Sequence, residues 1–272
     1  MPDQTPSPTH MLKVEGLQKS YGDFETLRDI SFTAKQGELI CIVGPSGCGK
    51  TTLLKSIAGL LAPSGGTVEL DGEPVTGPPK KMAVVFQEYG RSLMPWMTVR
   101  RNVELPLLRT TPKTERTRLV DEALAAVGLS AAGDKFPWQL SGGMQQRVAI
   151  ARAVSYGPEV LIMDEPFAAV DAQTRADLED LVRDIWQKFG VTVLFVTHDI
   201  DESVYLGQRV IVLSMTPTVV QEDLTIDLPA ERDQLTTRAL PRFTELRTHV
   251  YEQIQKAKRD HERQPDAEAP AA

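Results

Sequence analysis

The feature that most constrains this chain is a glycine-rich run, which we call the phosphate loop: Gly44-Pro45-Ser46-Gly47-Cys48-Gly49-Lys50-Thr51-Thr52. Its glycines permit backbone conformations closed to most residues, so several N–H groups can converge on one anion. Lys50 can reach the β- and γ-phosphates of a nucleotide, and the Thr51 hydroxyl can ligate Mg²⁺. Residues 39–43 form an apolar run typical of a buried strand, and the apolar spacing of residues 53–61 predicts a helix. The motif predicts a phosphate site, and an ordinary glycine-rich turn before a helix is the alternative.

The composition is that of an ordinary globular protein: 272 residues, of which 41% are hydrophobic and 25% charged. A formal net charge of −7 does not favour binding to nucleic-acid backbone. The two cysteines, Cys41 and Cys48, lack C-x-x-C spacing, which indicates a reducing compartment without a disulfide framework. No apolar run approaches the length of a membrane span. The polar, proline-rich residues 1–10 are expected to be a disordered leader without a secretion signal.

Polar residues follow three predicted buried strands where each strand ends. They are Gln87, Asp164, Glu165 and His198. Open α/β sheets place their ligands at the carboxyl ends of strands, so Gln87 can contact Mg²⁺ or water and His198 a γ-phosphate. Adjacent carboxylates repel each other, and a bound Mg²⁺ with a polarised water would explain the pair Asp164-Glu165. The alternative at each position is a solvated loop residue.

Residues 88–157 carry several helical patterns and few strand signals, which predicts a helical subdomain. Within it, Ser141 is a candidate N-cap, and Gly142 and Gly143 leave backbone N–H groups bare at a helix start. This second anion-binding terminus has an ordinary capped helix as its alternative. Near the start of the segment, Trp96 is either a buried anchor or an exposed apolar contact for a partner.

Further predictions concern two aromatic residues, Tyr21 and Trp186, and the last third of the chain. Tyr21, between two strand-like runs, either covers the core or stacks on a nucleotide base. The helix that ends at Gly190 is strongly amphipathic, which places Trp186 in the core. Residues 210–213 are predicted to be the last strand. A helix is expected from Phe243 to about Ala257.

Taken in chain order, the motifs resemble those of the nucleotide-binding subunit of ATP-binding cassette (ABC) transporters. The resemblance covers about residues 11–214 and is carried by Gly44–Thr51, Gln87, Leu140–Gln145, Val160–Glu165, Asp171 and His198. Met144 departs from the family pattern, which commonly has Gln there. The sequence before Asp171, Ala-Ala-Val, also departs from the usual Ser-Ala-Leu.

The resemblance implies an α/β fold: a P-loop NTPase core with a mixed sheet, an N-terminal antiparallel β subdomain and an inserted α-helical subdomain. The ATP-binding domain would span residues 11–214. Its expected parts are a core of residues 11–87 and 158–214 and a helical subdomain of residues 88–157. A C-terminal extension of residues 215–257 and a flexible tail of residues 258–272 would follow.

The resemblance also implies roles for these residues in ATP hydrolysis. Tyr21 would stack on adenine, and the phosphate loop would bind the phosphates. Thr51, Gln87 and Asp164 would surround Mg²⁺. Glu165 would orient the attacking water as general base, with His198 on the γ-phosphate and Lys50 and Gln87 assisting. The residues that would act on ATP bound to a second copy are Ser141, Gly142, Gly143, Gln145 and Asp171.

A single chain holds one phosphate loop and one such signature, so we expect a homodimer that sandwiches two ATP molecules. Residues 85–99 and the region around Asp227 resemble the nitrate/sulfonate/taurine importer branch. That likeness implies a peripheral ATPase on the cytoplasmic face of the membrane, two membrane permease subunits and an extracytoplasmic substrate-binding protein. The alternatives are an ABC ATPase that acts on nucleic acid or ribosomes, and an importer of another substrate class.

Overall fold

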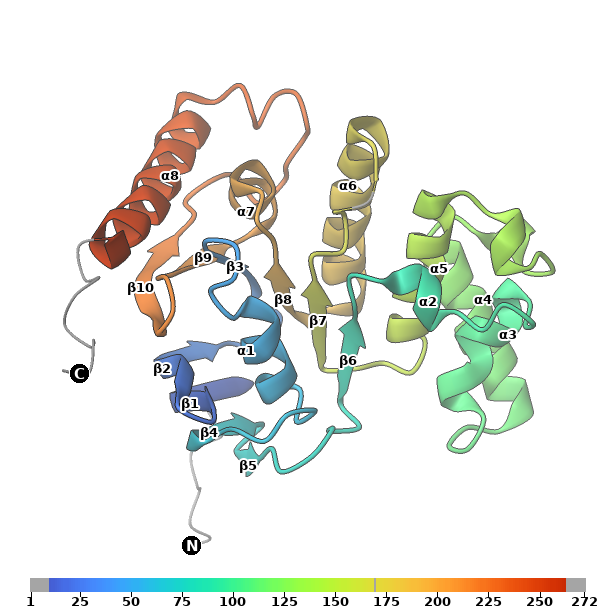
Figure 1. Cartoon of the computed structure of the whole chain (residues 1–272). Helices are drawn as coiled ribbons and strands as arrows, with labels where there is room; N and C mark the ends of the chain where they lie inside the picture. Colours follow the sequence, from blue (N-terminus) through green and yellow to red (C-terminus); the bar gives the residue numbers. More distant parts are fainter. Residues whose placement is uncertain (1–9, 169, 263–272) are drawn as a thin grey trace, which may run out of the picture. The chain divides into compact units, whose positions relative to one another are not determined.

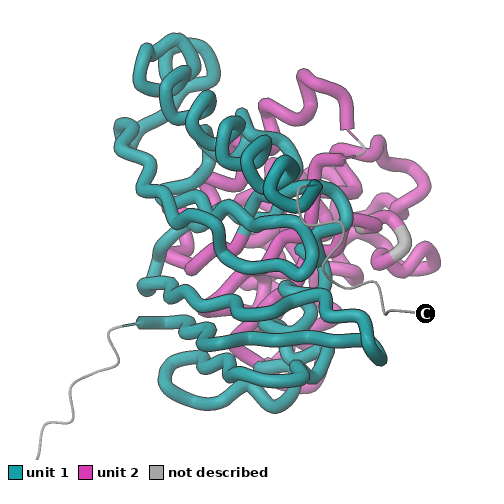
Figure 2. Tube along the Cα trace, turned by 60° about the vertical axis from the view of Figure 1, so that its left-hand side comes forward, with its two compact units in different colours: residues 1–79, 195–272 teal, residues 80–194 magenta. Residues whose placement is uncertain are grey.

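The computed structural model describes residues 10–168 and 170–262. The chain forms two compact units: residues 1–79 with 195–272, and residues 80–194 (Figure 2). The helices and strands of both are labelled in Figure 1. None of the helices in the described residues is both long and apolar enough to cross a lipid bilayer. The expected leader falls almost wholly outside the described residues, as does most of the expected tail.

The first unit is built on a mixed sheet. Its strands are β1 (Leu12–Tyr21), β2 (Phe24–Ala34), β3 (Leu39–Val43), β4 (Gly65–Leu70), β5 (Glu73–Pro74), β9 (Arg209–Leu213) and β10 (Thr218–Thr225). They lie in the order β5-β4-β1-β2-β10-β9-β3. The pairs β1–β2, β1–β4, β4–β5 and β9–β10 are antiparallel, whereas β2–β10 and β3–β9 are parallel. The predicted α/β fold, with an N-terminal antiparallel β part, is confirmed.

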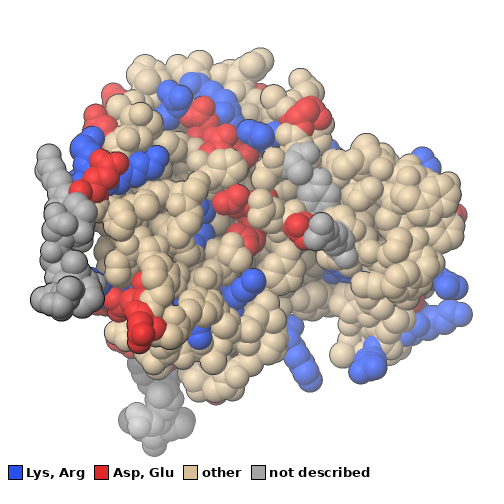
Figure 3. Space-filling view, viewed as in Figure 1, with Lys and Arg blue, Asp and Glu red and all other residues tan. Residues whose placement is uncertain are grey.

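Three helices belong to this unit: α1 (Lys50–Ile57), α7 (Ile200–Leu206) and α8 (Pro241–Glu262). Helix α7 packs on β3, and α8 packs on α7, β9 and β10. The buried face of α8 carries Phe243, Leu246, Val250 and Ile254, spaced three or four residues apart. On its exposed side, acidic and basic groups lie next to one another (Figure 3), as in the ion pair Arg242–Asp227.

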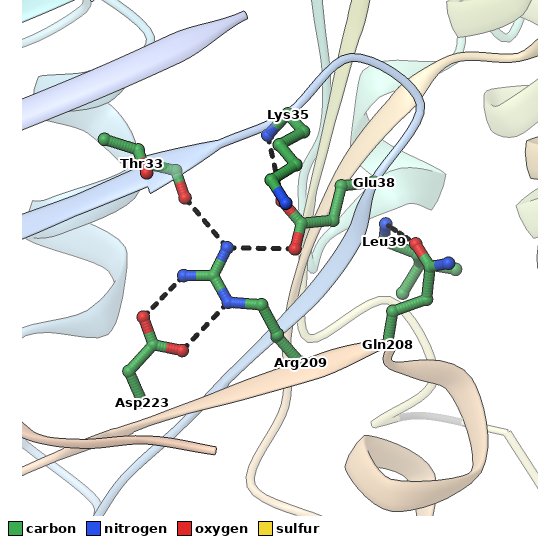
Figure 4. Close-up of polar contacts among 7 residues, drawn as sticks. All are labelled: Thr33, Lys35, Glu38, Leu39, Gln208, Arg209 and Asp223. Carbon is green, nitrogen blue, oxygen red and sulfur yellow. Dashed lines mark hydrogen bonds and ion pairs between the residues drawn. The ribbon is translucent and has the colours of Figure 1, made fainter. Parts of the chain in front are cut away.

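A half-buried arginine ties three strands of this sheet together (Figure 4). Arg209 donates to Glu38 (2.9 Å), to the carbonyl of Thr33 (3.0 Å) and, with both remaining nitrogens, to Asp223. The pKa of Arg209 is raised, chiefly by the hydrogen bond to Asp223, against the opposing effect of burial. Such a two-pronged contact fits the planar guanidinium and would not fit lysine.

The second unit is mainly helical. Its helices are α2 (Tyr89–Ser92), α3 (Val99–Glu104), α4 (Lys113–Ala126), α5 (Gly142–Val154) and α6 (Ala172–Phe189), with short 3₁₀ turns at Leu105–Leu107, Ser130–Ala132 and Pro137–Gln139. Strands β6 (Met82–Val85) and β7 (Val160–Asp164) pair in parallel. Helix α5 contacts α2, α3, α4 and β6. Strand β8 (Thr192–Val196) contains the boundary between the units.

Strands β3, β7 and β8 are buried along their entire lengths. Strands covered on both faces are expected to be continuously apolar rather than alternating. The runs Leu-Ile-Cys-Ile-Val and Val-Leu-Ile-Met before the predicted site residues have this pattern. These strands therefore fix the backbone positions from which the site loops emerge.

Several sequence predictions are wrong. The chain has a further strand after residue 213, which is β10. The sequence does not predict it, because β10 is mostly half-exposed and its polar sequence lacks the pattern of a buried strand. The sequence Thr111-Pro112 predicts a helix with the proline as its first residue, but helix α4 begins at Lys113 and Pro112 is the preceding cap residue. Helix α8 extends to Glu262, beyond the expected end near residue 257. Trp186 is only half-buried, and the Arg183 guanidinium lies 5.5 Å from its ring centre.

Candidate functional site

The phosphate loop joins β3 to α1. Gly47 and Gly49 have positive φ angles of 79° and 91°, a conformation that side chains disfavour. A Cβ on Gly49 would also lie 2.8 Å from Cγ2 of Thr26. Both facts explain why glycine is needed there, and they set the loop tightly against β2. Helix α1 begins at Lys50, inside the loop, so the first backbone N–H groups of the helix belong to the loop, as an anion site at a helix start requires.

The side chains of the loop divide into buried and accessible groups. Lys50 is only 7% exposed, and its Nζ donates to the carbonyls of Gly44 (3.0 Å) and Pro45 (3.2 Å). Cys48 is fully buried, as expected of a small packing residue. Thr51 is exposed, so its hydroxyl is open to a ligand. The loop thus carries a lysine held against its own backbone and a hydroxyl at its rim.

His198 follows β8 and is exposed, while both of its neighbours are fixed. The Thr197 hydroxyl donates to the buried Glu202 carboxylate (2.5 Å) and accepts the N–H of Asp199 (2.9 Å). Asp199 in turn caps α7 by accepting the N–H groups of Asp201 (2.8 Å) and Glu202 (3.2 Å). His198 also lines an open cavity of about 480 Å³ beside α8. The imidazole is therefore accessible on a backbone that is held in place.

Tyr21 ends β1 and pairs across the hairpin with Phe24. Its side chain is 51% exposed, and Nζ of Lys19 lies 5.3 Å from its ring centre. The core-covering alternative requires a buried ring, which the structure does not show. The exposed ring leaves area on which a base could stack.

In the second unit, the predicted metal and base residues lie at strand ends. Gln87 is exposed, two residues after β6. Asp164 is the last residue of β7 and is 5% exposed. Glu165, directly after it, has a φ angle of 44°, an uncommon conformation for a residue with a Cβ. No cluster of three His, Cys, Asp or Glu side chains able to hold a metal occurs in residues 10–168 and 170–262. A metal here would need phosphate oxygens or other donors as well.

Helix α5 begins with the predicted signature. Ser141 is its N-cap, and the side chain accepts the N–H of Met144 (3.3 Å). A Cβ on Gly143 would lie 2.5 Å from Cγ2 of Thr174, at the start of α6. The Gln145 amide turns back to the chain and donates to the carbonyl of Pro137 (3.1 Å). The start of α5 is thus fixed by contacts on both sides.

Asp171 is the N-cap of α6. Its carboxylate accepts the backbone N–H (3.0 Å) and the hydroxyl (2.7 Å) of Thr174. These hydrogen bonds, the backbone one first, lower the pKa of Asp171 from its ordinary value of 3.8. The carboxylate is therefore ionised at neutral pH and remains at the surface.

The structure divides the predicted site residues between the two units. Tyr21, the phosphate loop and His198 lie in the first, and Gln87, Ser141, Gly142, Gly143, Gln145, Asp164, Glu165 and Asp171 lie in the second. Sequence reasoning missed Glu202, which anchors Thr197, and the residues Thr216 and Thr218, which contact the phosphate loop. No local motif marks these residues, because each contact joins segments that form different elements.

Comparisons with known proteins show the family to which the chain belongs. Residues 27–168 match the model of a family described as "ABC transporter". The chain is 49% identical over 228 residues to an uncharacterized ABC transporter ATP-binding protein of Methanocaldococcus jannaschii, which covers 82% of this chain and 85% of that protein. It is 47% identical over 213 residues to the nitrate import ATP-binding protein NrtD of a Synechocystis species, covering 78% of this chain and 79% of the relative.

One solved structure resembles the chain with a TM-score of 0.68 and 32% identity, and the match covers 79% of this chain and 99% of the solved chain. It is described as a dimeric post-hydrolysis state of an ATP-binding cassette bound to ADP and Pi. The family, the relatives and the fold thus agree with the predicted ATP chemistry. The chain belongs to the ABC transporter family, as an ATP-binding subunit that is an ATPase.

Proposed function

We propose that two copies of this chain, arranged head to tail, hydrolyse ATP and energise the uptake of a small anion across the cytoplasmic membrane. The proposal depends on how many anion-binding sites one chain contains. One chain has one phosphate loop and one signature helix start, each with the backbone of an anion site. If the signature acts on ATP held by another copy, two chains complete two sites.

Within one copy, the phosphate loop would bind the phosphates through its backbone N–H groups, with Lys50 turning from its present carbonyl partners to the β- and γ-phosphates. Thr51, Gln87 and Asp164 would hold Mg²⁺, since hydroxyl, amide and carboxylate oxygens are the hard ligands this ion prefers. Bound Mg²⁺ would neutralise charge that develops on the phosphates. The Tyr21 ring would stack on the base.

Glu165 would accept a proton from, and orient, the attacking water, and His198 would contact the γ-phosphate. From the second copy, Ser141, Gly142 and Gly143 would offer hydroxyl and N–H donors to that phosphate. Gln145 and Asp171 would contribute to the same shared site, Gln145 by fixing the signature through its contact with Pro137.

The decisive experiment compares Glu165→Gln and Lys50→Ala with the wild type. Glu165→Gln should bind ATP without turning it over and should shift from monomer to dimer in gel filtration with light scattering when Mg·ATP is added. Lys50→Ala should lose both ATP binding and turnover. A Glu165→Gln protein that stays monomeric at high concentration with ATP would overturn the sandwich, and turnover by Lys50→Ala would overturn the assigned site.

The loop before α3 supports the proposed contact with a membrane permease. Trp96 is 70% exposed, yet the loop around it is fixed by the fully buried Asn102. The Asn102 side chain accepts the N–H of Met94 (2.8 Å) and donates to the carbonyls of Met94 (3.1 Å), Met97 (3.2 Å) and Thr98 (3.1 Å). A large apolar group on a rigid loop is typical of a protein contact.

The nitrate import relative supports a small anion as substrate. We further propose that a substrate-binding protein lies outside the membrane and that this subunit is peripheral on the cytoplasmic face. Co-purification with the permease subunits tests the contact. Trp96→Ala should retain ATP turnover in the isolated subunit and lose the permease, whereas Trp138→Ala, which removes an equally exposed tryptophan (70%), should keep it. Transport of nitrate or a sulfonate in reconstituted vesicles would then identify the anion.

A further inference from the structure

Two threonines after β9 contact the back of the phosphate loop. The Thr216 hydroxyl donates to the carbonyl of Gly47 (3.2 Å), and the Thr218 hydroxyl donates to the carbonyl of Cys48. Thr218 is fully buried and Thr216 is half-buried. Thr216 lies in the connection between β9 and β10, and Thr218 is the first residue of β10. Both are about 170 residues from the phosphate loop along the chain.

Each bonded carbonyl fixes the direction of an N–H group. In a trans peptide unit, the C=O of one residue and the N–H of the next point in opposite directions. The bond from Thr218 to Cys48 therefore orients the N–H of Gly49. The bond from Thr216 to Gly47 orients the N–H of Cys48, which donates to the carbonyl of Pro45 (3.3 Å) and so closes a turn within the loop. Because Gly47 and Gly49 themselves impose little conformational restriction, the loop needs such outside contacts to hold one conformation.

From this geometry we infer that Thr216 and Thr218 are positioning residues, which preorganise the backbone of the phosphate loop for the phosphates of ATP. The inference rests on the proposed binding of phosphates by that loop. Neither threonine would touch the nucleotide. Their effect would pass through the peptide units of Gly47 and Cys48.

Strand β10, which begins at Thr218 just after Thr216, is itself held on both sides. Thr218 pairs with Leu27 in the parallel β2–β10 contact, next to Thr26, against which Gly49 packs. On the other side, β10 is tied to α8. Gln221 donates to the carbonyl of Gln253 (2.9 Å), and the His249 ring and the Glu222 carboxylate are 2.8 Å apart. The C-terminal strand and helix thus give the threonines a firm support.

The test uses the full chain with Thr218→Val, which keeps the shape and removes the hydroxyl. Losing a buried hydrogen-bond donor should weaken binding of a fluorescent ATP analogue and raise KM for ATP by about tenfold, with kcat changed by less than about twofold. Thr218→Ser, which restores the hydroxyl, should return both values to those of the wild type. Thr216 is half-buried and will tolerate substitution, so Thr216→Val should also weaken ATP binding and raise KM for ATP.

The matched control is Thr237→Val. Thr237 is also buried, and its hydroxyl accepts the N–H of Asp233 (2.9 Å), away from the loop. It should lower the unfolding midpoint without changing KM. The inference is overturned if Thr218→Val and Thr216→Val bind ATP as the wild type does, or if Thr237→Val raises KM equally. A wild-type protein that does not bind ATP would refute the proposed function instead.

Discussion

The close approach of Gly143 to Thr174 allows a sharp test of how the signature helix is packed. A Cβ at residue 143 would lie 2.5 Å from the Thr174 methyl carbon, a separation that real contacts do not show. Thr174 cannot easily rotate away, because its hydroxyl is bonded to Asp171 at 2.7 Å. Gly143→Ala must therefore displace the start of α5 or break that bond.

The expected cost follows from two opposing effects. Overpacking of this kind costs about 1–3 kcal/mol. Alanine is favoured over glycine in a helix by at most about 1 kcal/mol, and by less in the first turn. Gly143→Ala should therefore lower the free energy of unfolding by about 1–2 kcal/mol.

The compensating change is Thr174→Ser, which removes the clashing methyl and keeps the hydroxyl for Asp171. The Cβ of residue 174 would then be the nearest atom, at 3.9 Å, an ordinary contact. In the Thr174→Ser background, Gly143→Ala should cost less than about 0.5 kcal/mol, giving a coupling of at least about 0.5 kcal/mol.

Urea unfolding of the four proteins measures this coupling. Gly77→Ala is the control, because its added Cβ would meet nothing within 4 Å and it should unfold like the wild type. If Gly143→Ala is as stable as the wild type, or if Thr174→Ser does not relieve its cost, the packing argument for the signature glycine is wrong.

Two further predictions concern charged groups. Arg209→Leu should lower the free energy of unfolding by about 2 kcal/mol, because it removes the ion-pair partner of the Glu38 carboxylate, whose side chain is only 11% exposed. A loss below about 0.5 kcal/mol in urea unfolding would contradict this. Because the folded-state pKa of Asp171 lies below 3.8, its stabilising effect is present above that pH and is lost as the pH falls through the folded-state value. Acid unfolding curves should therefore be shallower below about pH 4 for Asp171→Asn than for the wild type, and identical slopes would refute the role assigned to its bonds with Thr174.

The sequence predicts the parts of this molecule whose causes are local. The run Leu39–Val43 is apolar because the strand is buried on both faces, and the glycines after it are needed by the backbone itself. The N-caps Ser141 and Asp171 act within three residues of their own position, on the N–H groups of Met144 and Thr174. Such features can be inferred from neighbouring residues alone.

Other features depend on contacts between distant segments, which a single sequence does not reveal. Arg209 meets Glu38 and Asp223 only because β9 lies where it does in the sheet. The sequence does not predict β10 because its own pattern is mostly polar. The strand pairs with β9, just before it in the chain, and with β2, nearly 200 residues earlier (Thr218 with Leu27). The same pairing brings Thr218 to the phosphate loop.

Glutamate at position 165 is not the residue that would best stabilise the backbone conformation found there. Among the described residues, only Asp71 and Glu165 have a positive φ without being glycine. Aspartate tolerates this conformation through local hydrogen bonds, whereas a longer side chain such as glutamate is rarely found there. Glycine would adopt the same backbone at lower conformational cost, as Gly47 and Gly49 do in the phosphate loop. A carboxylate at this strained position therefore supports the proposed role of Glu165 in orienting the attacking water, at some expense to stability.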